Sequence, residues 1–152
     1  MKVRFTDPSH RLSQDLVGFA KRLSIMNALV MEPVKSRALI VVANGSPDNR
    51  VLLILTHTLD GEKHIDIAFP KHKSVSIFDY IHRYVTLGYE YILIVIDQET
   101  MDLNHIINEF HKRVQGVKSS KYINRVIHSE VIYGVHKSSI YVVINGVTDP
   151  GV

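Results

Sequence analysis

The chain lacks cysteine altogether, and it has no long hydrophobic run. The absence of cysteine excludes disulfides, thiol catalysis, iron–sulfur clusters and cysteine-ligated zinc, and it favours an intracellular protein over a secreted one. No run approaches the roughly 20 apolar residues that a membrane span needs. The segment Met1–Pro8 has no apolar stretch of the kind found in signal peptides. We therefore expect a cytoplasmic protein that has no membrane partner.

The chain also has only a small excess of positive over negative charge. The formal net charge is only +3 and the isoelectric point is about 9.1. Both signs are interspersed, so this small excess does not by itself predict a nucleic-acid partner. A chain of 152 residues has the size of one domain and can bury roughly 70% of the surface that it exposes when unfolded. We expect a single domain over residues 1–152, with an N-terminal amphipathic helix over 8–31 and an α/β core over 38–147.

The first helix is indicated by a capping residue and by apolar periodicity. Asp7 is a favourable N-cap, and Pro8 suits the first helical position. Apolar residues then recur at spacings of three and four, which places them in one stripe: Leu12, Leu16, Phe19, Leu23, Met26 and Val30. More apolar residues lie beside this stripe, so the helix has surface both for its own sheet and for a second subunit. We expect a homodimer through this helix; the alternative is a helix that is buried within its own domain.

The next segments indicate three strands. Ala38–Ala43 and Val51–His57 are apolar and rich in β-branched residues, with a loop between them. Asp60-Gly61 is a strong hairpin signal, which joins the second strand to Lys63–Phe69. We therefore expect an antiparallel meander of three strands.

Helices and strands alternate in the rest of the chain. Helices are expected over residues 75–87, ending at Gly88, and over residues 101–115, ending at Gly116. Strands are expected at 91–96, 126–133 and 140–146. The predicted fold class is therefore α/β on the border of α+β: a single mixed sheet in which the meander is followed by alternating helix and strand, with a helix added at the N-terminus.

This order of elements resembles that of an RNase H-like fold over residues 38–133. In nucleases of that superfamily, one metal-binding acid lies in the first strand and another at the end of the fourth. Asp97 matches the second position, whereas the first strand here carries no acid. If the residues after Ala43 instead begin a crossover, the chain resembles a Toprim domain, in which a glutamate follows the first strand and an Asp-x-Asp follows a later one. Those places hold Asn44 and Asp97-Gln98-Glu99.

Asp97 and Glu99 are the candidate catalytic and metal-binding residues. The apolar strand that ends at Asp97 is predicted to deliver both acids to the carboxyl edge of the sheet, where open α/β sheets bind their ligands. Mg²⁺ is the cofactor that such an edge would take, with Asp48 or Asp66 across it if the strands are neighbours. The alternative is structural: Asp97 caps exposed amides, and Glu99 stabilises the start of the next helix.

The one sizeable segment with a single sign of charge runs from His111 to Arg125. Its candidate nucleic-acid-binding residues are Lys112, Arg113, Lys118, Lys121, Tyr122 and Arg125. The cations would contact phosphates while the tyrosine stacks on a base, as in proteins that bind single strands. The alternative is that the first two cations complement the dipole at a helix C-terminus, while the others keep a loop solvated.

No complete catalytic constellation accompanies these candidates. The chain has no nucleophile elbow, no glycine-rich phosphate loop and no zinc-binding spacing among its nine histidines. The sequence therefore favours a non-catalytic interaction module without an evident cofactor, acting as a homodimer or as an adaptor that associates with nucleic acid. The alternative is an enzyme, a divalent-metal-dependent phosphodiesterase similar to a nuclease, which uses the acidic sheet edge at Asp97.

Overall fold

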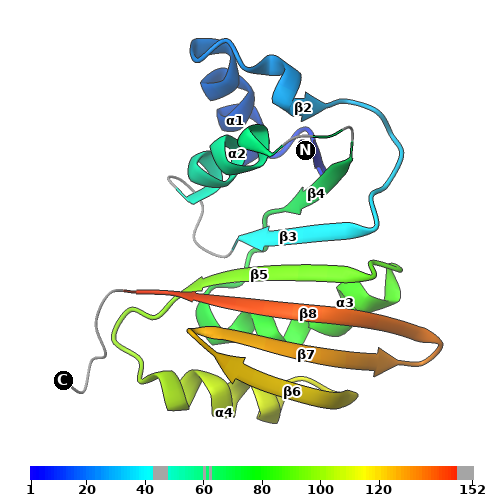
Figure 1. Cartoon of the computed structure of the whole chain (residues 1–152), viewed down its shortest axis with the longest axis vertical. Helices are drawn as coiled ribbons and strands as arrows, with labels where there is room; N and C mark the ends of the chain where they lie inside the picture. Colours follow the sequence, from blue (N-terminus) through cyan, green and yellow to red (C-terminus); the bar gives the residue numbers. More distant parts are fainter. Residues whose placement is uncertain (43–47, 60, 62, 147–152) are drawn as a thin grey trace.

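A computed structural model describes residues 1–42, 48–59, 61 and 63–146. These residues form one mixed sheet of eight strands with helices on both of its faces (Figure 1). The predicted α/β class with a single mixed sheet is thereby confirmed. Within the described residues, no helix is both long enough and apolar enough to cross a membrane.

The strands lie in the order β2-β1-β4-β3-β5-β8-β7-β6. The first six in this order are parallel, whereas β7 pairs antiparallel with both β8 and β6. The bounds of the strands are β1 Lys2–Phe5, β2 Leu29–Val30, β3 Ala38–Val42, β4 His64–Ala68, β5 Tyr91–Asp97, β6 Val117–Ile123, β7 Val126–Tyr133 and β8 His136–Asn145. Those of the helices are α1 Arg11–Arg22, α2 Asp48–Thr58, α3 Ile81–Thr86 and α4 Leu103–Arg113, with two 3₁₀ helices, η1 Met26–Ala28 and η2 Ser74–Tyr80.

Residues 51–57 belong to a helix, so the predicted antiparallel meander is wrong. α2 crosses from β3 to β4, and these two strands are parallel neighbours. An apolar run of only seven residues fits a buried strand and a helix segment, and the helical spacing of its residues is evident only when Leu59, beyond the run, is included. The resemblance to an RNase H-like order rested on that meander, whereas the alternative of a crossover after β3 is what the structure has. Asp60 of the predicted hairpin turn and the predicted loop residues 44–47 lie outside the described residues.

The N-terminal segment is also divided differently from the prediction. Its first residues form β1, and the helix ends at Arg22 rather than near residue 31. His10 is the N-cap in place of Asp7, since its ring nitrogen Nδ1 accepts a hydrogen bond from the backbone N–H of Leu12 at 3.0 Å. Ser24 then adopts a left-handed backbone with a φ of 56°, which ends the helical path before η1 and β2. Strands as short as β1 and β2 contain too few residues for alternation to be recognised.

The C-terminal half follows the prediction more closely. β5, α4 and β7 lie where their patterns place them, and both predicted helix stops, Gly88 and Gly116, have a positive φ. A Cβ atom at position 116 would lie 2.0 Å from the carbonyl oxygen of Ile132, so only glycine fits there. The basic segment contains a strand that the sequence analysis missed: β6 is joined to β7 by a two-residue turn, Asn124-Arg125, in which both residues have a positive φ.

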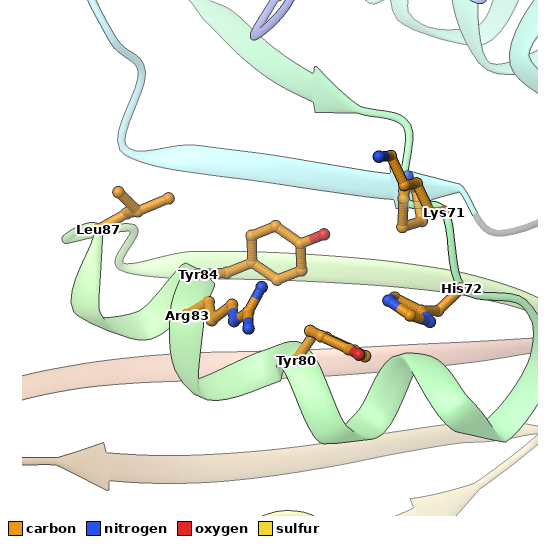
Figure 2. Close-up of a pocket in the computed structure, with 7 residues that line it drawn as sticks. Lys71, His72, Tyr80, Arg83, Tyr84 and Leu87 are labelled. Carbon is orange, nitrogen blue, oxygen red and sulfur yellow. The ribbon is translucent and has the colours of Figure 1, made fainter.

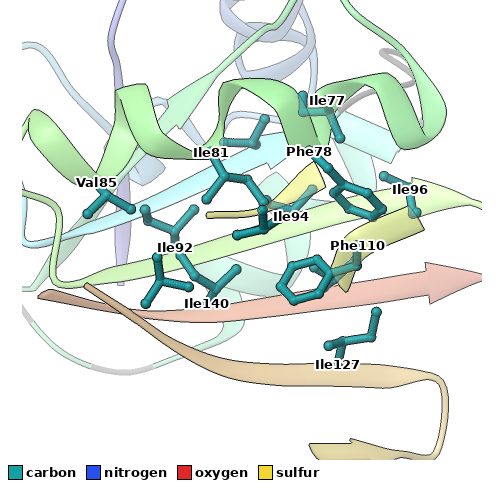
Figure 3. Packing of buried hydrophobic residues seen from close by; sticks show 14 of the residues in the cluster. Ile77, Phe78, Ile81, Val85, Ile92, Ile94, Ile96, Phe110, Ile127 and Ile140 are labelled. Atoms are coloured by element: carbon teal, nitrogen blue, oxygen red, sulfur yellow. The ribbon is translucent and has the colours of Figure 1, made fainter. Parts of the chain in front are cut away.

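Two separate hydrophobic cores lie on opposite faces of the sheet. One lies under α1 and α2 and is built mainly on β1, β3 and β4. The other lies between β5, β8 and β7 on one side and η2, α3 and α4 on the other, where Phe78 and Phe110 meet edge to face at 5.3 Å (Figure 3). Side chains alternate between the faces of a strand, so β5 gives Ile92, Ile94 and Ile96 to the second core.

The two cores overlap on β3, β4 and β5, and each leaves one end of the sheet outside it. No residue of β8, β7 or β6 belongs to the described core under α1 and α2. Likewise, no residue of β1 or β2 belongs to the described core under α3 and α4. Two surfaces follow. We call the α3 side of β1 and β4 the polar quarter (Arg4 and Asp66), and the α2 side of β5, β8, β7 and β6 the apolar quarter (Leu93, Val95, Tyr141, Val143, Val126, His128, Lys121 and Ile123).

Candidate functional site

The apolar quarter begins in a groove between α2 and the sheet. The groove has a volume of about 250 Å³. Its floor is formed by β5 and β8, which run parallel and turn alternate aliphatic side chains to this side. The lining residues are Asp48, Val51, Leu52 and Leu55 of α2, Leu93 and Val95 of β5, and Val143 and Asn145 of β8.

The register of the strands extends this surface across β7 to the sheet edge at β6. One row of neighbouring residues runs Leu93, Tyr141, His128, Lys121, and the next runs Val95, Val143, Val126, Ile123. The rings of His128 and Tyr141 are stacked, with centroids 4.4 Å apart and planes 4° from parallel. Ile123, at the edge of the sheet, is 62% exposed. A largely apolar surface therefore runs from α2 to the edge strand.

α2 carries an apolar stripe that extends from the groove to the solvent, since Val51 and Leu55 also line the groove. Val51, Ile54, Leu55 and Leu59 recur at helical spacing along α2 and just beyond its end, with exposed fractions between 42% and 54%. The opposite side of the helix is buried through Leu53 and its neighbours. Large apolar side chains that gather at an exposed surface commonly mark an interaction site. The outer stripe therefore indicates a surface that a partner covers.

The predicted acid Asp97 ends β5 at the carboxyl edge, beside the groove. Asn145 is its partner in register on β8. Asp48 begins α2 close by: burial raises the pKa of Asp48, and the negative charge of Asp97 raises it further. Of the two acids that the sequence offered as partners across the edge, Asp48 is therefore the one beside Asp97.

Glu99 takes no part in the pairing that involves Asp97 and Asp48. It is exposed in the turn after β5, with a φ of 52°. Asp102, rather than Glu99, caps α4, because its carboxylate accepts a hydrogen bond from the backbone N–H of Asn104 at 2.9 Å. The described residues contain no group of three or more His, Cys, Asp or Glu that could hold a metal ion. A divalent cation at this edge would rely on the two paired aspartates, with water and substrate oxygens as its other ligands.

Asp66, the other predicted partner, lies in the polar quarter and not at this edge. It is fully buried and accepts hydrogen bonds from the guanidinium of Arg4 at 2.8 and 2.6 Å and from the hydroxyl of Tyr89 at 2.7 Å. The backbone N–H of Ser36 donates to the same carboxylate. The hydrogen bond to Asp66 raises the pKa of Arg4, and burial, more than this carboxylate, raises the pKa of Tyr89. The carboxylate is satisfied within the fold, so its role is structural.

Two of the predicted nucleic-acid-binding residues are engaged inside the domain. Arg113, at the end of α4, forms ion pairs with Glu109 at 2.6 Å and with Asp79 at 2.8 Å. Arg125 donates to the carbonyl oxygen of Ile144 at 3.0 Å and to the side chain of Gln98. These guanidinium groups therefore have partners that a phosphate would have to displace.

The other four predicted nucleic-acid-binding residues are exposed, and they are divided between a helix and a strand. Lys112 lies on α4, whereas Lys118, Lys121 and Tyr122 lie on the edge strand β6. Neighbouring residues of a strand point to opposite faces, so Lys121 and Tyr122 do not build a common platform. Lysines on an edge strand also deter pairing with foreign strands, which gives them a structural role. Nucleic-acid binding by this segment stays a prediction.

The apolar stripe of the first helix is used largely within the domain. Leu16 is fully buried, and Leu12 and Phe19 are half-buried. Leu23 and Met26 follow the helix and are 48% and 40% exposed. Dimerisation through this stripe stays a prediction. The outer stripe of α2 was missed because residues 51–57 were interpreted as a strand; the helical spacing of its apolar residues was the available signal.

Comparisons of the chain with models of protein families, with curated proteins and with solved structures gave no match. Function is therefore inferred from the chemistry and geometry of the site itself.

Proposed function

We propose that this chain is a non-catalytic interaction module of the cytoplasm that acts as a homodimer, in which α2 of each copy covers the apolar quarter of the other. The observation that carries the proposal is the presence of two complementary uncovered surfaces in one molecule: an apolar helix stripe and an apolar sheet face beside it. Each surface is of the kind that the other would bury.

The strands of the apolar quarter support this interpretation. Parallel strands are found almost only where both faces of the sheet are covered. β5 and β8 are parallel over their whole pairing, from Tyr91 to Asp97, and η2, α3 and α4 cover one face of them. On the other face α2 reaches only the groove. A second copy supplies the missing layer.

Symmetry makes a second copy a suitable occupant. In a two-fold dimer the same patch of each subunit is used twice, so a patch that contains both a helix stripe and its receiving surface closes on itself. Charge fits the same arrangement. Asp48 and Asp97 lie at one end of the patch, and Lys121 lies on its edge strand. A two-fold axis between these regions brings acid and base together twice.

The available area fits a modest specific interface. Four strands about 4.8 Å apart and about 17 Å long present roughly 300 Å², and three turns of helix add roughly 150 Å². Two copies would bury on the order of 900 Å² in all, close to the roughly 1,000 Å² of small specific interfaces. We therefore expect a dimer that dissociates on dilution.

The test is the mass of the chain in solution as a function of concentration, measured by sedimentation equilibrium. The wild type should shift from dimer to monomer on dilution, and Leu55→Glu should be monomeric at concentrations where the wild type is dimeric. Leu23→Glu is the matched control, because Leu23 is similarly exposed (48% against 54%) but belongs to the first-helix stripe. A wild type that is monomeric at every concentration contradicts the proposal. Loss of the dimer in Leu23→Glu with retention in Leu55→Glu would return the interface to the first helix.

A second candidate function is divalent-cation-dependent phosphodiester chemistry at the carboxyl edge. The observation that favours it is the proximity of Asp48 and Asp97, which is close enough for the charge of one to raise the pKa of the other. A cation between two such carboxylates neutralises their repulsion and polarises a phosphoryl oxygen. The edge lies where open α/β sheets place their ligands.

Cleavage of labelled single-stranded DNA and RNA with Mg²⁺ or Mn²⁺ tests this second function. Asp97→Asn should abolish cleavage without lowering the temperature of thermal unfolding, whereas Glu99→Gln should retain cleavage, because Glu99 is not part of the pair. An unchanged rate in Asp97→Asn removes the hypothesis.

A further inference from the structure

A separate cavity of about 400 Å³ lies between the segment that follows β4 and the helices η2 and α3 (Figure 2). Pro70, Lys71 and His72 line it from the segment, and Tyr80, Arg83, Tyr84 and Leu87 line it from the helices and their end. The three central helical residues are spaced i, i+3 and i+4, which brings their side chains to one side of the helix. None of these residues lines the groove beside α2.

The cavity is cationic, and no carboxylate lines it among the described residues. Lys71 and Arg83 are exposed, and neither forms an ion pair within the part of the chain that the structure describes. The acid that precedes Tyr80, Asp79, is held by Arg113 at 2.8 Å. Two permanent cations therefore face the cavity without a carboxylate partner among the described residues, which favours a ligand with at least one phosphate.

The walls of the cavity are aromatic and already ordered. His72 stacks on Tyr80, with ring centroids 3.9 Å apart and an angle of 11° between the planes. The guanidinium of Arg83 lies 4.8 Å from the centroid of the same Tyr80 ring. Flat heteroaromatic rings bind to such surfaces by stacking, because every base has a π-face.

Tyr84 adds a neutral hydrogen-bond donor. Burial raises the pKa of its hydroxyl, although the charge of Arg83 lowers it. The phenol is therefore protonated at neutral pH and can donate to an oxygen of the ligand. Figure 2 shows Tyr84 and Arg83 on the helix side of the cavity, with Lys71 and His72 on the side of the segment.

We propose that this cavity binds a single nucleotide, with the phosphate between Lys71 and Arg83 and the base against the His72–Tyr80–Arg83 stack. The volume lies within the roughly 300–1,000 Å³ of small-molecule sites. A free mononucleotide and the terminal nucleotide of a strand present the same phosphate and base, so both sources satisfy the chemistry. The inference is independent of the homodimer, because the two surfaces have no lining residue in common.

Calorimetric titration of the full chain tests the proposal with AMP, UMP, adenosine, inorganic phosphate and a 5′-phosphorylated oligothymidylate. AMP or UMP should bind at least tenfold more tightly than either adenosine or phosphate alone, because only the nucleotide uses both the cations and the rings. Tighter binding of the oligonucleotide than of the mononucleotides would identify the terminal nucleotide as the source. Equal affinity for phosphate and nucleotide, or no heat with any of the probes, overturns the proposal.

Variants then place the site. Arg83→Gln and, on the exposed segment, Lys71→Gln should each weaken nucleotide binding at least tenfold, and Tyr84→Phe should weaken it by a smaller factor. Arg11→Gln is the control, because Arg11 is an exposed arginine on α1, outside the cavity. Full nucleotide affinity in both Arg83→Gln and Lys71→Gln, with the fold verified by circular dichroism, rules the cavity out as the site.

Discussion

The two quarters of the sheet that lie outside the helical cores are built in opposite ways. In the polar quarter, β1 and β4 turn Arg4 and Asp66 to the uncovered side, where Tyr89 completes a network of charged hydrogen bonds. In the apolar quarter, β5 and β8 turn aliphatic side chains such as Leu93 and Val143 to the α2 side, where both are half-buried, and α2 adds an exposed stripe. One surface is charged and the other is largely apolar, although both belong to one continuous sheet.

The difference distinguishes a surface that is complete within one chain from one that needs a partner. The linker that follows β2 closes the polar quarter: Ser36 donates to the carbonyl oxygen of His64 at 2.6 Å, and the ring of His64 lies 3.1 Å from the carbonyl oxygen of Val34. Polar groups that are paired inside the molecule are stable without a second layer. Aliphatic side chains gain only from being removed from water, so the apolar quarter is stabilised by any chain that covers it.

The largest effect is expected when the buried ion pair of the polar quarter is broken. Asp66→Asn removes the negative charge from a fully buried position and leaves the guanidinium of Arg4, which is 14% exposed, without a counter-ion. Breaking a buried ion pair on one side costs about 3–5 kcal/mol. Urea unfolding should show this loss of stability in the monomer. Glu90→Gln is the control, because the pair of Glu90 with Arg37 is exposed, and its loss should leave the free energy of unfolding nearly unchanged. Equal costs in the two variants would mean that the polar quarter is not held by its ion pair.

The second prediction concerns the apolar quarter. Val143→Asp places a charge on the floor of the groove, so it should weaken the dimer by more than about 100-fold, since a buried unpaired charge costs more than about 2.7 kcal/mol. Sedimentation equilibrium measures this change. Val135→Asp makes the same substitution in the turn between β7 and β8, where the side chain is 95% exposed, and should leave the dimer intact. A dimer that tolerates the charge at position 143 does not use the apolar quarter.

The sequence predicted some parts of the fold and of the candidate site but not others. The strand of β5, its terminal Asp97 and the helix stops at Gly88 and Gly116 follow from local patterns, and the structure has all of them. These signals are local: β5 is a short continuous apolar run bounded by polar residues, and each glycine directly follows a segment of helical periodicity.

What the sequence did not predict depends on long-range packing. The run from Val51 to His57 fits a strand or a helix, and only its place between two parallel strands makes it the crossover α2. The position of Asp48 beside Asp97 follows from that crossover, since the two residues are 49 positions apart in the sequence. The ion pair of Arg4 with Asp66 likewise joins residues 62 positions apart. Neither pairing leaves any period in the residues around it.

A smaller change, on α2, measures how much apolar contact contributes to the affinity of the dimer. Leu55→Ala removes part of one exposed side chain of α2 without adding a charge, and in a two-fold dimer the change occurs twice. The dimer should weaken by about tenfold, which corresponds to about 1.4 kcal/mol. The free energy of unfolding of the monomer should change by no more than about 0.5 kcal/mol, because the side chain is exposed there. Leu23→Ala is the control, and a loss of the same size in both variants would show that generic surface hydrophobicity drives association.

The smallest expected effect is a change in how the free energy of unfolding depends on pH. It arises from the two aspartates at the carboxyl edge of the sheet. Burial and the charge of Asp97 raise the pKa of Asp48 in the folded state. The folded state therefore holds a proton more tightly than the unfolded state, so this contribution to stability is fully present below the ordinary carboxyl pKa of about 3.9 and is lost as the pH rises through the raised value.

Asp97→Asn removes one of the two causes of the raised pKa. The stability of dilute monomer, measured by urea unfolding from about pH 3 to pH 7, should therefore fall less steeply with pH than in the wild type. Asp102→Asn is the control, because Asp102 caps α4 and is not among the causes of that shift. Identical profiles for Asp97→Asn and the wild type would show that the two carboxylates do not interact, and the edge would then resemble the polar quarter, in which each acid is satisfied by its own partners.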